Sequence, residues 1–153
     1  MIYKNVTDFK QNLKENQRLL SIDYGTRKTG IALSDRKIQI STPCTTIFSS
    51  SENVILLELN KLIEENIMGG IVIGFPFSNN NQESLVVERI LSFSEKLVLR
   101  FNLPILLFCE RNTSKMADEF LLNLNLKRKR RNKLDDKIAA SIILKNVIEE
   151  LNK

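Results

Sequence analysis

Short apolar runs alternate along the chain with longer stretches in which apolar positions recur at helical spacing. The runs Arg18 to Asp23 and Thr29 to Leu33 are joined by a turn bounded by glycines, a pattern that predicts a β-hairpin. A third strand, at the edge of the sheet, is predicted between Ile38 and Ile47, where Pro43 interrupts the run. The first part of the fold is therefore expected to be antiparallel.

The middle of the chain predicts helices that alternate with buried strands. Apolar residues at helical spacing indicate helices over residues 52–66 and 83–101. The continuous apolar runs Gly70 to Gly74 and Pro104 to Cys109 are typical of parallel strands that are covered on both faces. We therefore expect parallel pairing in this part of the sheet.

The last part of the chain predicts two more helices. One is expected to begin at Thr113 or Ser114 and to run through Asn123, and the last to begin near Asp135 or Asp136. A basic run between them is expected to be a loop. Strands followed by βαβα alternation indicate an α/β sandwich with a mixed sheet, antiparallel at the hairpin and parallel after it.

Length and composition narrow the class of protein. The chain has 153 residues, enough for one domain with its own core. It contains no run of 18 apolar residues and no signal-peptide pattern at its start, so we expect a soluble, cytoplasmic protein with no membrane contact. Cys44 and Cys109 form no CxxC pair, which argues against a zinc site or a disulfide, and both are expected to be small buried residues.

The chain contains no histidine. The Ser-His-Asp triad, the Cys-His pair and the HExxH zinc site all require histidine, so these reaction classes are excluded. Chemistry by carboxylates, lysine or metal-bound water remains open.

The positive charge of the chain is concentrated in one short segment. The net charge is +5, and without the six cations of this segment the remainder stands at −1. A solvated loop is the default interpretation of such a run, but closely spaced cations repel one another and usually indicate an anionic partner. The six residues are Lys127, Arg128, Lys129, Arg130, Arg131 and Lys133.

Three acidic residues are expected at the carboxyl edge of the sheet, where sites of α/β proteins gather. Asp23 and Glu110 follow predicted strands, and Asp136 opens the last predicted helix. Clustered carboxylates repel one another until a divalent cation neutralises them, and their oxygens suit Mg²⁺ or Mn²⁺. Such a site can hydrolyse a phosphodiester without an imidazole, and the basic run suits a nucleic-acid substrate.

Each of these residues also has a simpler interpretation. Asp23 alone could form an Asx turn, and Glu110 with Arg111 could be an exposed ion pair of little energetic value. One of Asp135 and Asp136 could cap the last helix, and we assign the cap to Asp135 and the metal to Asp136. Only the combination of the three acids points to a metal site.

Four separated blocks of this chain resemble the YqgF (RuvX) family. The first is IDYGTRKTGIALSD, similar to the family pattern DxGTxxxGxAxSD, and the second is IVIGFP, similar to VGLP. The third, CERNTSKMA, is similar to DERxST, and the fourth, KRKRRNKLDDKIAASIIL, is similar to a basic run followed by DxxAAxxIL. Family members are described as Holliday-junction resolvases and as nucleases of the 16S ribosomal RNA precursor.

The resemblance implies a ribonuclease H-like fold: a five-stranded mixed sheet whose first three strands are antiparallel, with helices on both faces. It implies a single nuclease domain over residues 18–153, preceded by an N-terminal extension over residues 1–17. The family's acidic residues fall on Asp23, Glu110 and Asp136, the same three that the residue pattern selects. Cys109 replaces the family's aspartate, and Asn79 to Asn81 are expected to lie in a loop where the family has Asp-Gly.

The leading hypothesis is a metal-dependent nuclease in which the three acids hold Mg²⁺ or Mn²⁺. Arg27, Lys28, Arg111 and the basic run would position backbone phosphates without reading bases. The resemblance implies 5′-end processing of pre-16S rRNA, with ribosomal particles as a further partner. The alternatives are a resolvase of branched DNA, a non-catalytic RNA-binding module, and a kinase-like phosphotransferase that the short chain disfavours.

Overall fold

The computed structural model describes residues 1–76, 81–109 and 128–153, and for residues 81–84 and 128–135 it describes the helical backbone without the side chains. The helix predicted between Thr113 and Asn123 lies outside these residues. Within the described part of the chain, no helix has the length and apolar character needed to cross a membrane.

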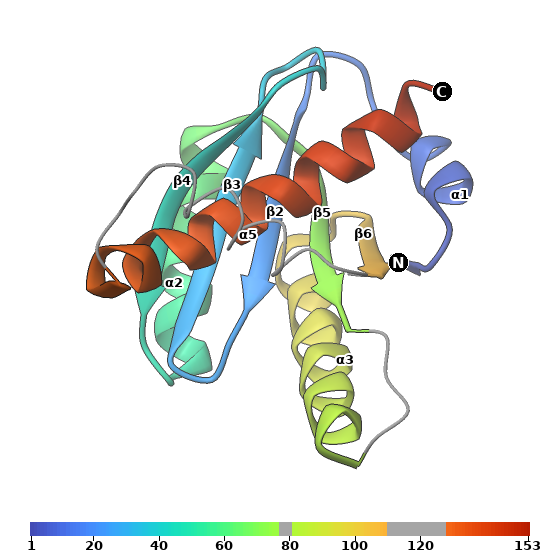
Figure 1. Cartoon of the computed structure of the whole chain (residues 1–153). Coiled ribbons are helices and arrows are strands. Elements are labelled where there is room, and N and C mark those ends of the chain that lie inside the picture. The colour runs from blue at the N-terminus through green and yellow to red at the C-terminus, as the bar shows by residue number, and fades with distance from the viewer. Residues whose placement is uncertain (77–80, 110–127) are drawn as a thin grey trace.

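One six-stranded sheet forms the centre of the molecule, in the order β1-β6-β5-β2-β3-β4 (Figure 1). The three strands β2, β3 and β4 are antiparallel neighbours, whereas β1, β6, β5 and β2 run parallel. The predicted mixed sheet is confirmed, but the expected five strands are one too few because the chain start adds β1. The strands are β1 (Ile2–Tyr3), β2 (Arg18–Tyr24), β3 (Lys28–Ser34), β4 (Ser41–Phe48), β5 (Met68–Phe75) and β6 (Ile105–Cys109).

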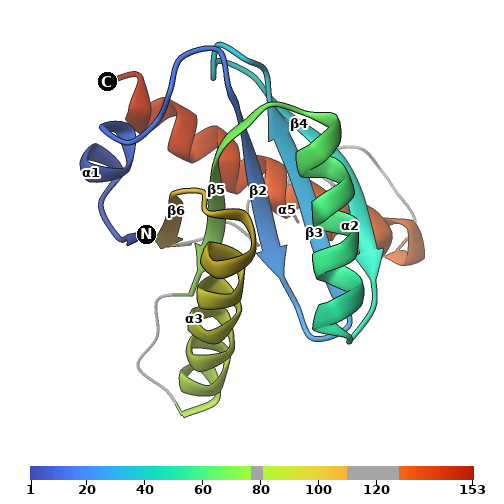
Figure 2. The ribbon, with the colours of Figure 1, turned by 180° about the vertical axis from the view of Figure 1, so that it is seen from behind.

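Helices cover both faces of the sheet, as expected. Figure 1 shows α5 (Arg128–Leu151) crossing one face diagonally, with α1 (Val6–Lys10) beside its carboxyl end. Figure 2 shows α2 (Glu52–Glu65) and α3 (Asn81–Phe101) on the opposite face. We refer to these two sides as the α5 face and the α2/α3 face.

The alternation of side chains along each strand divides the core into two clusters. In β2, Leu20, Ile22 and Tyr24 pack in the cluster on the α2/α3 face, whereas Leu19 packs in the cluster on the α5 face. β5 is buried along nearly its whole length, as a parallel strand covered on both faces should be. The side chains of even-numbered and odd-numbered residues in β2 therefore lie on opposite faces of the sheet.

The first seventeen residues take part in the fold rather than trailing from it. β1 pairs in parallel with β6, and Phe9 of α1 is fully buried in the cluster on the α5 face. The Lys10 ammonium donates to the carbonyl oxygen of Leu151 at 2.5 Å, which joins α1 to the last turn of α5. This contact also neutralises part of the negative end of the helix dipole.

Both cysteines are exposed, and the prediction that they are buried was wrong. Cys44 lies in the edge strand β4 at a shift in register, where Ile31 pairs with Thr45 and Ala32 with Pro43. An edge strand at a bulge has no neighbour to cover such a residue. Cys109 is the last residue of β6.

The last helix begins earlier than the pattern indicated. α5 starts at Arg128, so residues 128–133 of the basic run are helical and their prediction as a loop was wrong. Lysine and arginine are good helix formers, and a helix packed along most of its length can extend through them. Asp135 and Asp136 lie inside the helix and not at its start.

Candidate functional site

Asp23 lies at the carboxyl end of β2, one residue before the strand ends. It is half-buried, and its odd position places it on the α5 face together with Leu19. Its partner across the antiparallel ladder is Gly30 of β3. Directly opposed residues in such a pair have Cα atoms about 4.5–5.5 Å apart and side chains on the same face.

Gly30 marks the place where α5 comes closest to the sheet. A Cβ atom added to Gly30 would lie 1.9 Å from the carbonyl oxygen of Asp136 and 2.8 Å from the amide nitrogen of Lys137. Any side chain at position 30 would therefore push the helix away. Because Gly30 faces Asp23 across the ladder, the helix backbone at Asp136 lies beside Asp23, and the fold brings these two predicted acids together.

The carboxylate of Asp136 is poorly compensated within the described part of the protein. Its Oδ2 atom is buried and accepts no hydrogen bond there. Burial raises the pKa of Asp136 above its ordinary value, and the charge of Lys28 opposes this shift. A buried carboxylate oxygen without a donor is costly, and a divalent cation held with Asp23 would supply the missing charge. The donor set at this edge therefore fits Mg²⁺ or Mn²⁺.

Two further buried polar atoms surround the same point. Thr46 of β4 is the other ladder partner of Gly30, and Ser21 precedes Asp23 by two positions on the same strand face. Among the described residues, neither hydroxyl finds a hydrogen-bond partner. Sequence reasoning missed both. Ser21 could have been selected as a polar residue on a buried strand face, whereas no sequence signal identified Thr46.

Two predicted phosphate-binding residues lie at the turn beside Asp23. Lys28 begins β3 on the α5 face, close enough to Asp136 to lower its pKa, and its Nζ lies 6.0 Å from the ring centre of Phe48. Arg27 is exposed in the turn itself. The turn requires glycine at position 25, where a Cβ atom would lie 2.3 Å from the carbonyl oxygen of Lys28. The edge thus presents cations next to acids.

The remaining predicted site residues cannot be placed beside Asp23. Glu110, Arg111 and Lys127 lie outside the described residues, and the other five cations of the basic run lie in α5 without described side chains. Within the described ranges, no three acidic, cysteine or histidine residues form a group that could hold a metal. Two of the three expected ligands are thus together, and the third stays a prediction.

A polar network supports the same strand end from the α2/α3 face. The Tyr24 hydroxyl donates to Glu52 Oε1 at 2.9 Å, and Lys96 forms an ion pair with the other carboxylate oxygen of Glu52. The Tyr24 ring stacks on Phe93 with ring centres 4.2 Å apart, and the Arg89 guanidinium lies 5.1 Å from its centre. The Lys96 ammonium lowers the pKa of Glu52, so this acid is charged at neutral pH.

Comparisons with known proteins find similar sequences over nearly the whole chain. The model of a family described as RuvX, Holliday junction resolvase, matches residues 17–150. A protein of Rickettsia bellii named "Putative pre-16S rRNA nuclease" is 40% identical over 153 residues, which cover 100% of this chain and 99% of that protein.

Solved structures of Holliday junction resolvases share the fold. T. thermophilus RuvC in complex with a Holliday junction substrate aligns with a TM-score of 0.55 at 13% identity, over 83% of this chain and 91% of that one. Fowlpox virus resolvase in complex with Holliday junction DNA aligns with a TM-score of 0.56 at 15% identity, over 90% of this chain and all of that one. The predicted ribonuclease H-like fold is confirmed.

Proposed function

The chain belongs to the RuvX family, and on that premise we propose that it is a metal-dependent nuclease that hydrolyses phosphodiester bonds at the edge formed by Asp23 and Asp136. One observation carries the proposal. The α5 backbone at Asp136 rests on Gly30, the ladder partner of Asp23, and leaves a buried carboxylate oxygen of Asp136 without a donor among the described residues.

Asp23 and Asp136 would hold one or two Mg²⁺ or Mn²⁺ ions together with Glu110, which follows β6 in the sequence. When bound, such an ion activates water and neutralises the charge that develops on the phosphate. The protein contributes the position of its carboxylates, fixed by the sheet on one side and by α5 on the other. The raised pKa of Asp136 makes the bound cation the natural partner of its charged form.

Cations next to the acids would orient the nucleic acid. Arg27 lies in the turn before β3 and Lys28 is the first residue of that strand, and both would contact phosphates next to the scissile bond. Arg111 and the basic run would extend this contact along the backbone. Contacts of this kind set the register of the strand and carry no base specificity, so selectivity comes from the shape of the substrate.

The substrate that we propose is the 5′ end of the 16S ribosomal RNA precursor, free or in ribosomal particles. This rests on a relative 40% identical over the full chain that carries the name of a pre-16S rRNA nuclease. The family model instead carries the description Holliday junction resolvase, which keeps branched DNA as the second candidate. The two candidates share the same chemistry at the phosphodiester.

Replacement of Asp23 by asparagine tests the proposal, because the amide keeps the size of the side chain but loses the charge that holds a cation. We expect cleavage of precursor RNA to fall by more than about 100-fold, the upper end of the loss seen when a residue behind a metal ligand is changed. Mn²⁺ should also stabilise the wild-type protein against heat and should stabilise the variant much less.

Asp8→Asn is the matched control, because Asp8 is an exposed aspartate of α1 that takes no part in the site. A four-way DNA junction and precursor RNA are compared as substrates. Equal cleavage by wild type and Asp23→Asn would remove Asp23 from the mechanism. Binding without cleavage by the wild-type protein in Mg²⁺ and in Mn²⁺ would identify a non-catalytic RNA-binding module instead.

A further inference from the structure

A pocket of about 440 Å³ lies at the other end of β2 from Asp23. It is bounded by the residues that lead into β2, by the loop after β3 and by the end of α5. The three lining residues that are not exposed are apolar: Leu13, Ile38 and Leu151. They form an apolar floor beneath an exposed polar rim.

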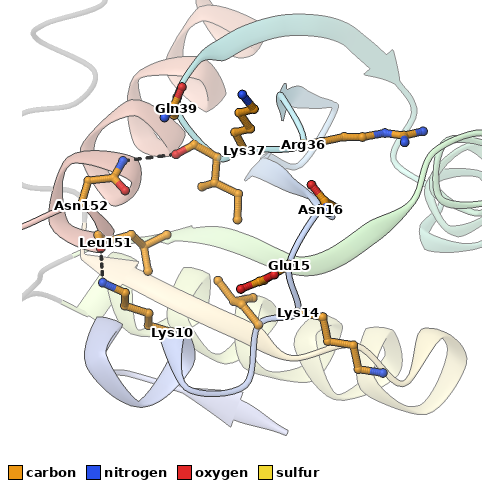
Figure 3. A pocket seen from close by; sticks show the side chains of 11 residues that line it. Lys10, Lys14, Glu15, Asn16, Arg36, Lys37, Gln39, Leu151 and Asn152 are labelled. Carbon is orange, nitrogen blue, oxygen red and sulfur yellow. Dashed lines mark hydrogen bonds between the residues drawn. The ribbon is translucent and has the colours of Figure 1, made fainter.

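The rim carries strong positive charge. Lys10, Lys14, Arg36 and Lys37 line the pocket, and Glu15 is the one acidic residue that lines it. Lys10 is already engaged, because it donates to the carbonyl oxygen of Leu151 and offsets the negative end of α5. No ion pair within the described residues involves Lys14, Arg36 or Lys37. In Figure 3, Lys14 and Arg36 extend outward from different sides of the pocket.

The loop that presents Arg36 and Lys37 is held in one conformation by Asp35. The Asp35 carboxylate accepts from the amides of Gln39 at 2.7 Å, Ile40 at 2.8 Å and Lys37 at 3.3 Å. Burial alone would raise the pKa of Asp35, but these donors outweigh it and lower the pKa. Asp35 closes the first motif of the chain, yet it lies far from the acids of the proposed site. Its role is to shape this loop.

The same loop stores backbone strain. Ile38 has a φ of 53°, a conformation that a β-branched residue rarely adopts. Its carbonyl oxygen accepts from Asn152 Nδ2 at 3.2 Å, so the residue after α5 holds the loop in place (Figure 3). Strained residues that are fixed by several contacts concentrate at binding and catalytic sites.

We propose that this pocket is a second phosphate-binding site, at which Lys14, Arg36 and Lys37 hold the backbone of the nucleic acid whose other segment lies at the Asp23 edge. The inference takes the nucleic-acid substrate of the proposed function as its starting point. Arg36 offers a planar fork that matches a phosphate, and the two lysines add point charges around it.

The combination of rim and floor favours nucleic acid over an acidic polypeptide. A polynucleotide repeats negative phosphates at a regular spacing with apolar sugar and base surfaces between them, which matches cations around an apolar floor. An uninterrupted run of glutamates or aspartates offers carboxylates with little apolar surface between them. It would be held by the rim alone and would leave Leu13, Ile38 and Leu151 uncovered.

The separation between the two sites sets the length of strand that can reach both. Arg36 lies six positions after Gly30 along β3 and its following turn, so at about 3.3 Å per position the distance is about 20 Å. At about 3.4 Å per nucleotide along a strand with stacked bases, about six nucleotides cover it. A tetranucleotide with stacked bases would therefore occupy one site at a time, and an RNA of about 16 nucleotides would reach both.

The test compares the salt dependence of binding for two triple variants in an Asp23→Asn background, which keeps the RNA intact during the measurement. One variant carries Lys14→Ala, Arg36→Ala and Lys37→Ala. The control carries Lys4→Ala, Lys61→Ala and Lys145→Ala, three exposed lysines that do not line the pocket. Each phosphate contact contributes about 0.7 to the slope of log affinity against log salt for a single strand.

We expect the pocket variant to lower this slope by about two units on the longer RNA and by less on the tetranucleotide, which can also bind at the Asp23 edge. The control variant should change neither. The same sequence as DNA should show an equal loss, which would assign the contact to phosphate alone, whereas a loss confined to RNA would overturn the phosphate contact in favour of sugar recognition.

An unchanged slope on the longer RNA, or an equal change in the control variant, would overturn the proposal. So would poly-glutamate binding that the pocket variant loses while RNA binding persists, because it would identify an acidic polypeptide as the occupant. A failure of the proposed nuclease function appears separately, as absent cleavage by wild-type protein, and leaves this binding test intact.

Discussion

At Asp136, the stability of the metal-free fold and the proposed binding of a metal favour different charge states of the carboxylate. Burial raises its pKa, so the folded protein prefers the neutral form. The raised pKa therefore contributes stability that is complete below the ordinary pKa of 3.8 and is lost as the pH rises through the folded-state pKa. At neutral pH and without metal, the charged side chain therefore destabilises the fold.

Replacement of Asp136 by asparagine should stabilise the metal-free protein at pH 7. The expected gain is of the order of 1 kcal/mol, or roughly 2–4 °C in melting temperature, because the buried charge is removed. The difference from wild type should vanish below pH 3.8, where both side chains are neutral. Thermal melts across this pH range, with and without Mn²⁺, measure both effects.

Mn²⁺ should reverse the order of stability, because it binds the wild-type carboxylate and has no charged partner in the variant. The exposed Asp8→Asn exchange serves again as control and should show neither effect. A variant that melts lower than wild type at pH 7 without metal would show that the Asp136 carboxylate already has a stabilising partner, and the fit to a cation would lose its main support.

At the level of single residues, sequence reasoning selected Asp23 and Asp136 because each has a signal: the first ends an apolar run, and both belong to motifs. Thr46 gave none, since its burial depends on the register of β4 against Gly30. Cys44 was wrongly assigned to the core for a similar reason. Its exposure follows from a shift in strand pairing that neither the composition nor the periodicity of the sequence indicates.

Among the elements, the crossing of α5 over β3 determines whether the site can form. The helix backbone touches the sheet at Gly30, where the absence of a side chain permits the approach. Close-packed interiors do not absorb an extra methyl group at such a point without displacing one of the two elements. The position of Asp136 over Asp23 thus depends on a residue that carries no chemistry of its own.

Replacement of Gly30 by alanine should lower the free energy of unfolding by about 1–3 kcal/mol and weaken Mn²⁺ binding, because the added Cβ atom meets the rigid backbone of α5. Chemical denaturation and metal titration report the two effects. Gly69→Ala is the matched control, since its Cβ atom would meet the Cβ and Oε1 atoms of the Gln17 side chain at 2.8 Å instead of the backbone of α5. If the two variants behave alike, the contact at Gly30 does not position the helix.

The start of α5 could not be predicted from periodicity, for a physical reason. Apolar spacing reports only the part of a helix that faces a core, and the basic residues after Arg128 have no such spacing. Their helical propensity is favourable, but the same composition is typical of solvated loops. In contrast, β5 and α2 were predicted nearly to their bounds because burial and periodicity agree there.

For the molecule as a whole, two groups of cations lie far from each other. Six cations lie in the segment from Lys127 to Lys133, and three unpaired cations among the described residues stand around the pocket at the far end of β2. Charges that far apart act on a polyanion almost independently once salt screens them beyond about 10 Å. A nucleic acid long enough to contact both groups should therefore gain affinity from each group separately.

Alanine replacements across the basic run should lower the slope of log affinity against log salt by up to about four units, at about 0.7 for each of the six cations. Filter binding of a single-stranded RNA at several salt concentrations measures this slope. When combined with the pocket variant, the two decreases should add, because distant sites without shared partners are usually additive. A slope that does not respond to the basic run would exclude it from nucleic-acid binding.

The class and pairing pattern of the whole sheet could be predicted because each strand carries its own local signal. The sixth strand could not, since two residues at the chain start are too few for any period to appear. β1 exists only because Ile2 and Tyr3 find Ile105 and Leu106 beside them. Such a strand is a product of the finished fold.

This pairing between residues far apart in the sequence has a consequence for folding during synthesis on the ribosome. The Met1 carbonyl oxygen accepts a hydrogen bond from the Ile105 amide, and the Lys10 ammonium donates to the Leu151 carbonyl oxygen, so residues 1–10 must wait for partners that are translated much later. Until these partners have been synthesised, β1 and α1 lack the neighbours with which they pair and pack. A chain released a few codons early would lose Leu151 as the partner of Lys10, whereas β1 could still pair with Ile105, and its less firmly held α1 should become a target for proteolysis.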